Sequence, residues 1–150
     1  MIEKNKIEDV VKSLIAGSGI FLVSIKVNGS NKIVIHIDKN AGITIDECVT
    51  IHRGVEQHFN RDEEDYELQV SSPGLDSPFM VVEQYFKNEG KKVEVLDNEG
   101  KKYTGLLKNV TSGGFELETE LKAKGKPKET VELSFNFDQI KYVKTVLTIK

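Results

Sequence analysis

The sequence predicts an α+β protein in two parts: an N-terminal α/β domain over residues 1–77, and a small β-barrel over residues 78–150. Helical and strand periodicities alternate in the first part, whereas only strand patterns with tight turns follow residue 91. A turn-rich segment, SSPGLDSP at residues 71–78, separates the two patterns. The charge balance changes there too, from 8 Lys and Arg against 13 Asp and Glu in residues 1–80 to 13 Lys against 11 Asp and Glu afterwards.

The first predicted element is a helix whose apolar residues recur at intervals of three and four. They are Ile7, Val10, Val11, Leu14 and Ile15. Two strands are expected next, at about residues 20–27 and 32–38, and the turn signal Asn28-Gly29 joins them into an antiparallel hairpin. One face of the second strand carries only isoleucine, so we expect that face to be buried.

Thr44 opens a second helix, because Glu47 three residues later completes a capping box. We expect this helix to end around Asn60 and to turn an apolar stripe toward the sheet. The stripe comprises Cys48, His52, Val55 and Phe59, widened by Ile45 and Ile51. A strand at residues 66–70 then completes a three-stranded sheet covered by two helices.

For the second part, the sequence predicts a short helix that ends at Gly90, followed by five short strands. Alternating apolar residues such as Val93 and Val95, and later Phe115 and Leu117, are expected to face inward. Five strands with tight turns in about 60 residues favour a small barrel of the Sm-like or SH3-like kind.

The composition excludes several classes of protein. No run of apolar residues is long enough to cross a membrane, and the N-terminus does not have the pattern of a secretion signal. Cys48 is the only cysteine, so intramolecular disulfides and cysteine-rich zinc sites are excluded, and a reducing cytoplasm is the expected setting. His36 and His58 lack neighbours at metal-ligand spacing, so we expect neither a metal nor another cofactor.

Two segments carry a resemblance to a known family over nearly the whole chain. The segment YELQVSSPGLDSPF, from Tyr66 to Phe79, is similar to the strand and SSPGLDRPL signature of the RimP family of bacterial ribosome maturation factors. The segment VIHIDKNAGITIDECVTIHRGVEQHF resembles the family's second segment. Three departures are that Ser77 replaces the family's usual Arg, that His52-Arg53 replaces its usual Ser-Arg pair, and that the C-terminal strand YVKTVLTIK is only loosely similar to the family's ending.

The resemblance implies a non-enzymatic factor that binds the small (30S) ribosomal subunit during its assembly. It also implies contact with a basic ribosomal protein near the decoding region, and with rRNA. The acidic first part fits this partner, because complementary charge raises association rates and selects partners. We expect the factor to work as a monomer.

The turn-rich segment has two compatible interpretations. Pro73 and Pro78 make it a rigid connector between domains. The second interpretation adds direct contact with the ribosome through Ser71, Ser72, Gly74 and Asp76. A serine nucleophile is a third idea, but the sequence contains no Gly-x-Ser-x-Gly motif.

Two further sites are candidates for binding. Arg53 lies off the apolar stripe of its helix, either as an exposed binding cation or as a partner for Glu56. The segment KAKGKPK holds Lys122, Lys124, Lys126 and Lys128, and it is either a solvated hairpin loop or a contact for phosphate groups.

Two rival functions stay open beside the assembly factor. One is an Sm-like RNA-binding regulator that acts away from the ribosome, which a native ring of six or seven copies would favour. The other is a small hydrolase, which needs a nucleophile paired with a base or a metal site.

Overall fold

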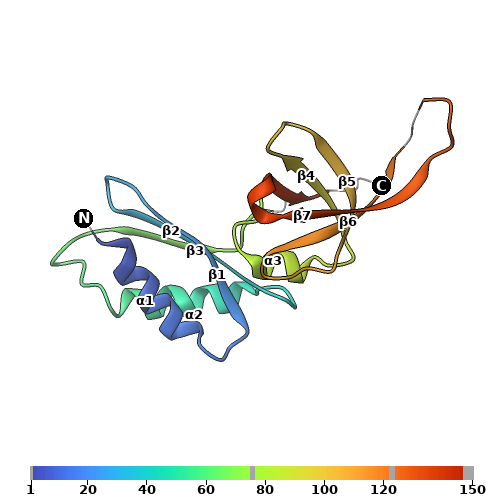
Figure 1. Cartoon of the computed structure of the whole chain (residues 1–150). Coiled ribbons are helices and arrows are strands. Elements are labelled where there is room, and N and C mark those ends of the chain that lie inside the picture. The colour runs from blue at the N-terminus through green and yellow to red at the C-terminus, as the bar shows by residue number, and fades with distance from the viewer. Residues whose placement is uncertain (1, 75–76, 122–123, 147–150) are drawn as a thin grey trace. The chain divides into compact units, whose positions relative to one another are not determined.

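The computed structural model describes residues 2–74, 77–121 and 124–146 (Figure 1). The chain divides into two compact units, Met1–Pro73 and Gly74–Lys150. This division falls four residues before the boundary that we placed between residues 77 and 78. The α+β class is confirmed.

The first unit is a three-stranded sheet with two helices on one face (Figure 1). Its elements are α1 (Lys4–Ile15), β1 (Ile20–Val27), β2 (Lys32–Lys39), α2 (Ile45–Glu56) and β3 (Glu67–Ser71). The strand order is β1-β2-β3, with β1 antiparallel and β3 parallel to β2. A parallel neighbour requires a crossover connection, and α2 provides it.

The predicted isoleucine face forms the core of this unit. Ile33, Ile35 and Ile37 are fully buried, together with Ile7 and Val11 of α1. Burying each of these isoleucines contributes roughly 1.5–3 kcal/mol. The periodicities of the hairpin and of the first helix are therefore confirmed.

Three expectations about α2 are wrong. The helix ends at Glu56 rather than near Asn60, because the chain tightens into a turn in which the His58 N–H bonds the Val55 carbonyl at 3.0 Å. Ile45 is 82% exposed, because it is the first residue of α2 and lies outside the core. The His52 side chain is 33% exposed and lies at the margin of the core rather than within it.

The second unit is a five-stranded antiparallel sheet that follows a short helix. Its elements are α3 (Val82–Lys87), β4 (Lys92–Asp97), β5 (Lys102–Lys108), β6 (Gly114–Leu121), β7 (Glu129–Asn136), the 3₁₀ helix η1 (Phe137–Gln139) and β8 (Ile140–Thr145). The strand order is β7-β6-β5-β4-β8.

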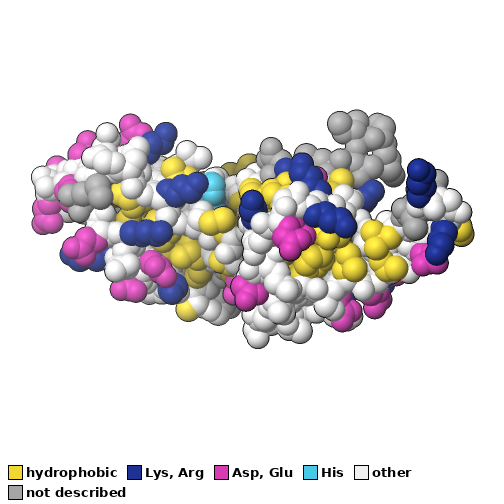
Figure 2. Space-filling view, turned by 45° about the horizontal axis from the view of Figure 1, so that its top comes forward, with side chains coloured by type: hydrophobic (Ala, Val, Ile, Leu, Met, Phe, Trp, Pro, Cys, Tyr) yellow, Lys and Arg dark blue, Asp and Glu magenta, His cyan; other side chains and the backbone are white. Residues whose placement is uncertain are grey.

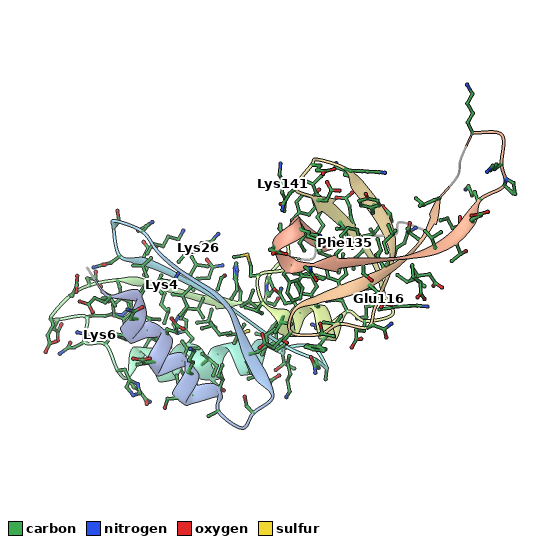
Figure 3. The ribbon with its side chains drawn as sticks, viewed as in Figure 1. Lys4, Lys6, Lys26, Glu116, Phe135 and Lys141 are labelled. Carbon is green, nitrogen blue, oxygen red and sulfur yellow. The ribbon has the colours of Figure 1, made fainter. Side chains whose placement is uncertain are left out.

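The predicted barrel is not closed, because β7 and β8 share no ladder within the described residues. The 3₁₀ helix η1 connects β7 to β8. β8 pairs with the edge of β4 that β5 leaves free, rather than with β7. Aromatic rings fill the interior: Phe137 lies 4.8 Å from Tyr85, and Phe115 lies 5.5 Å from Phe135, between ring centroids. Figure 3 shows Phe135 among these interior side chains.

Two glycines allow the strands of this sheet to approach closely. A Cβ atom at Gly105 would lie 2.2 Å from the Glu118 carbonyl oxygen, and one at Gly114 would lie 2.1 Å from that of Phe135. A side chain at either position would therefore push its neighbouring strand away. The close approach is therefore the reason that glycine stands at both positions.

Candidate functional site

A groove of about 450 Å³ runs between α2 and the end of β3, and we call it the α2/β3 groove. Every residue that lines it belongs to the first unit. The lining residues are Ile43, Thr44, Ile45, Cys48, Val49, His52, Arg53, Glu56, Val70, Ser71 and Ser72. The groove thus brings together three residues that the sequence singled out for binding: Arg53, Ser71 and Ser72.

The start of α2 is held by the predicted capping box, which is confirmed. The Glu47 N–H donates to Thr44 Oγ1 at 3.1 Å, and the Thr44 N–H donates to Glu47 Oε1 at 3.1 Å. Lys39 Nζ lies 3.1 Å from Glu47 Oε2. The backbone hydrogen bond from Thr44 and the bond from Lys39 lower the pKa of Glu47, so this carboxylate is charged at neutral pH.

The floor of the groove is apolar and partly open to solvent. Ile45 is 82% exposed and Val49 is 40% exposed, whereas Cys48 and Val70 are half-buried. Ile45, Val49 and Arg53 are spaced four residues apart, so they form a second stripe along α2, beside the one that faces the core. Sequence reasoning missed Ile45 and Val49 as site residues, although this spacing would have found them.

His52 links α2 to β3 through Nε2, whereas Nδ1 contacts a residue of α2 itself. Nε2 lies 3.1 Å from the Leu68 carbonyl oxygen, and Nδ1 lies 2.9 Å from Glu56 Oε1. Both partners only accept hydrogen bonds, so a neutral imidazole donates to one of them at a time, and an imidazolium donates to both. His52 therefore acts as a link between the helix and the strand.

Arg53 is exposed at the rim of the groove. The Glu56 carboxylate, its alternative partner, bonds His52 and Arg61 instead, with Arg61 Nη2 at 3.2 Å. No ion pair involves Arg53 among the residues that the structure describes. Of the two interpretations of Arg53, the geometry therefore favours the exposed cation, whose guanidinium is available to a ligand.

The described residues of the groove include polar groups but no activated nucleophile. Burial raises the pKa of the Cys48 thiol, and the charge of Glu47 raises it further, so Cys48 is a neutral thiol at neutral pH. The two ring nitrogens of His52 lie against the Glu56 carboxylate and the Leu68 carbonyl rather than against Ser71, Ser72 or Cys48.

The rest of the turn-rich segment leaves the groove. Gly74 is exposed, and its carbonyl accepts a hydrogen bond from the Ser77 N–H at 3.0 Å. The Phe79 N–H then donates to the Val143 carbonyl at 2.8 Å, which ties the chain to β8 in the second unit. Asp76, which we predicted as a contact, lies outside the described residues.

The predicted lysine loop forms the tip of the β6–β7 hairpin. Lys124, Lys126 and Lys128 are exposed, and Lys128 makes a long pair of 3.9 Å with Glu120; Lys122 lies outside the described residues. The hairpin below the tip carries acidic side chains, and Glu118 pairs directly with Glu132. Figure 2 shows this contrast of lysines at the tip and acidic groups below it, so the tip is the part of the hairpin that offers cations to a phosphate backbone.

The face of the first sheet that lies away from the helices is polar. Lys26 projects from it (Figure 3), and Ser24 Oγ lies 3.4 Å from His36 Nδ1. Burial lowers the pKa of His36, and the charge of Lys26 lowers it further. In the described part of the chain, no three His, Cys, Asp or Glu side chains cluster as a metal site would require.

No helix of the described residues has the length and hydropathy needed to span a membrane.

Comparison with known proteins relates most of the chain to one family. The model of the RimP N-terminal domain matches residues 7–76. The ribosome maturation factor RimP of Porphyromonas gingivalis strain ATCC 33277 is 36% identical over 146 residues, which is 94% of this chain and 96% of the relative. The proteins of that name from Christiangramia forsetii and Flavobacterium psychrophilum are each 32% identical, over 86% and 87% of both chains, respectively.

Proposed function

The chain belongs to the RimP family, and on this basis we propose that it is a ribosome maturation factor that binds the small (30S) subunit during assembly. The observation that carries the proposal is the similarity to proteins of this name along almost the entire chain. The factor acts by binding alone, as a monomer in the cytoplasm. It binds an assembly intermediate more tightly than the finished subunit, which shifts the population toward the productive state.

The two units supply different surfaces to this target. The α2/β3 groove, with Arg53, Ser71 and Ser72 at its rim, receives a basic ribosomal protein near the decoding region. The lysine tip of the β6–β7 hairpin contacts rRNA phosphates without reading sequence. The segment at residues 71–78 connects two domains, 1–77 and 78–150, so that both surfaces engage one particle.

The groove supports binding rather than turnover. Its floor is apolar, and Ile45 and Val49 expose side chains that a partner would remove from water. Its histidine is engaged on both nitrogens, so the hydrolase alternative gains no support from this site. A turnover that disappears in Ser72→Ala with folding intact would restore that alternative.

Sedimentation of a cell lysate through a sucrose gradient tests the proposal. We expect the protein to co-migrate with free 30S particles and to be absent from intact ribosomes. Recovery only at the top of the gradient, even at low salt, would contradict the proposal. A hexameric or heptameric ring at native mass would then favour the RNA-binding regulator.

A further inference from the structure

The strand β3 has one open edge. It is the last strand in the order β1-β2-β3, and the Glu67 N–H donates to the Asn31 carbonyl at 3.0 Å, beside β2. The backbone N–H and C=O groups of successive residues in a strand point to alternate sides. Gln69 and Ser71 therefore also direct these groups toward β2, whereas Leu68 and Val70 direct them away from it. The bond from His52 Nε2 to the Leu68 carbonyl agrees with this direction. The amide of Leu68 and both backbone groups of Val70 therefore face the open edge.

The opposite edge of the sheet is protected, whereas the β3 edge is not. The pairing of β1 with β2 shifts register between Leu22 and Ser24, and Lys26 is exposed on β1. Bulges and lysines are the usual devices that stop an edge strand from pairing with another chain. The sequence of β3, ELQVS, contains no lysine, arginine or proline, and its five residues pair with β2 in unbroken register.

The α2/β3 groove lies beside this open edge. Val70 and Ser71 of β3 line it together with Ile45 and Val49 of α2. A strand added to β3 would bond its backbone to Val70, and every second side chain would reach the exposed apolar floor. This is how an added strand usually gains specificity: backbone bonds supply affinity, and pockets select alternate side chains.

The loop that leads from α2 into β3 is acidic, which favours a basic strand as the partner. The stretch from Glu56 to Glu67 contains six acidic residues and one arginine. Arg61 already has partners within the loop and α2. Its Nη2 lies 3.2 Å from Glu56 Oε2, and its guanidinium carbon lies 4.5 Å from the centre of the Tyr66 ring. A segment with Lys or Arg between its apolar residues would therefore be attracted toward the start of β3.

We propose that the ribosomal partner binds by adding an extended, Lys/Arg-rich segment to the open edge of β3, with its apolar side chains in the α2/β3 groove. This inference rests on the proposed function, because it names how the protein partner of the subunit is held. It commits to a strand, whereas a helix or an RNA strand in the same groove would leave the edge amides of β3 unpaired.

Residue-resolved hydrogen exchange of the full chain, free and bound to purified 30S assembly particles, tests the added strand. We expect exchange at the Leu68 and Val70 amides to slow at least tenfold on binding. The Gln69 amide already faces β2 and should change little. Binding with unchanged exchange at Leu68 and Val70 would overturn the inference, whereas failure to bind the particles would overturn the proposed function itself.

A matched pair of variants tests the groove. Val49→Gln places a polar amide on the floor of the groove, whereas Thr50→Gln makes a similar change one residue along α2, at an exposed side chain outside it. We expect Val49→Gln to weaken binding about three- to tenfold, because one partly exposed valine is no longer buried by the partner, and Thr50→Gln to change it less than about twofold. Equal affinities for the two folded variants would overturn the role of the groove.

Discussion

Replacing His52 with leucine should loosen the first unit by a predictable amount. Leucine nearly keeps the volume of the side chain but cannot donate a hydrogen bond, so the Leu68 carbonyl is deprived of its partner at 3.1 Å. A hydrogen bond of this kind contributes about 0.5–1.5 kcal/mol, and a pair as exposed as His52 with Glu56 adds at most a few tenths more. We therefore expect the free energy of unfolding to fall by about 0.5–2 kcal/mol.

Urea unfolding followed by circular dichroism at 222 nm measures this change. The signal reports mainly on the first unit, because α1 and α2 have 12 residues each, whereas α3 has 6. His58→Leu is the matched control, since His58 Nδ1 bonds the Gly54 carbonyl of its own turn at 2.9 Å and is exposed. His52→Gln should recover part of the stability, because its amide also donates. A His52→Leu variant as stable as the His58→Leu control would show that His52 does not fasten α2 to β3.

Three other changes have expected outcomes. The pKa of the Glu47 carboxyl is lowered in the folded state. Its contribution to stability is therefore present above its unfolded pKa and is lost as the pH falls through its folded pKa. In an acid titration, Glu47→Gln should lose less stability over this pH range than the unchanged protein does. Gly114→Ala should destabilise the second unit by about 1–3 kcal/mol, because its Cβ atom would lie 2.1 Å from the Phe135 carbonyl oxygen; an unchanged thermal midpoint would refute the close approach. Replacing four lysines with Glu, at Lys122, Lys124, Lys126 and Lys128, should weaken binding to 30S particles and flatten its dependence on salt. The slope of log K against log salt concentration should fall by about 0.7 for each phosphate group that is no longer neutralised. An unchanged affinity would show that the loop does not contact phosphate groups.

Most of the elements follow from features that are local in the chain. The capping box at Thr44 and Glu47 involves residues three apart, and the buried faces of α1 and β2 follow from the spacing of their isoleucines and valines. The sequence therefore suffices to place these elements. The sequence-based prediction misjudged the end of α2, where the chain tightens into a turn, and the exposure of Ile45, which is the first residue of the helix and lies outside the core.

The candidate site was only partly predictable. Arg53, Ser71 and Ser72 were chosen separately from the sequence, and their meeting in one groove follows from the parallel pairing of β3 with β2. Arg53 was one possible partner of Glu56, but the structure gives that carboxylate to His52 on the same face of α2 and to Arg61 in the following loop. Charge and helical spacing cannot decide between such competing partners.

The sequence by itself determined where the helices and strands lie, which faces are apolar and where the charge balance changes. It could do so because periodicity, capping and turn formation depend on residues close together in the chain. Only the tertiary structure decided that β3 has an open edge, that His52 reaches the Leu68 carbonyl 16 residues away, and that β7 and β8 share no ladder among the described residues. These features depend on which strands become neighbours, and that choice is made by burying the whole core rather than by any one segment.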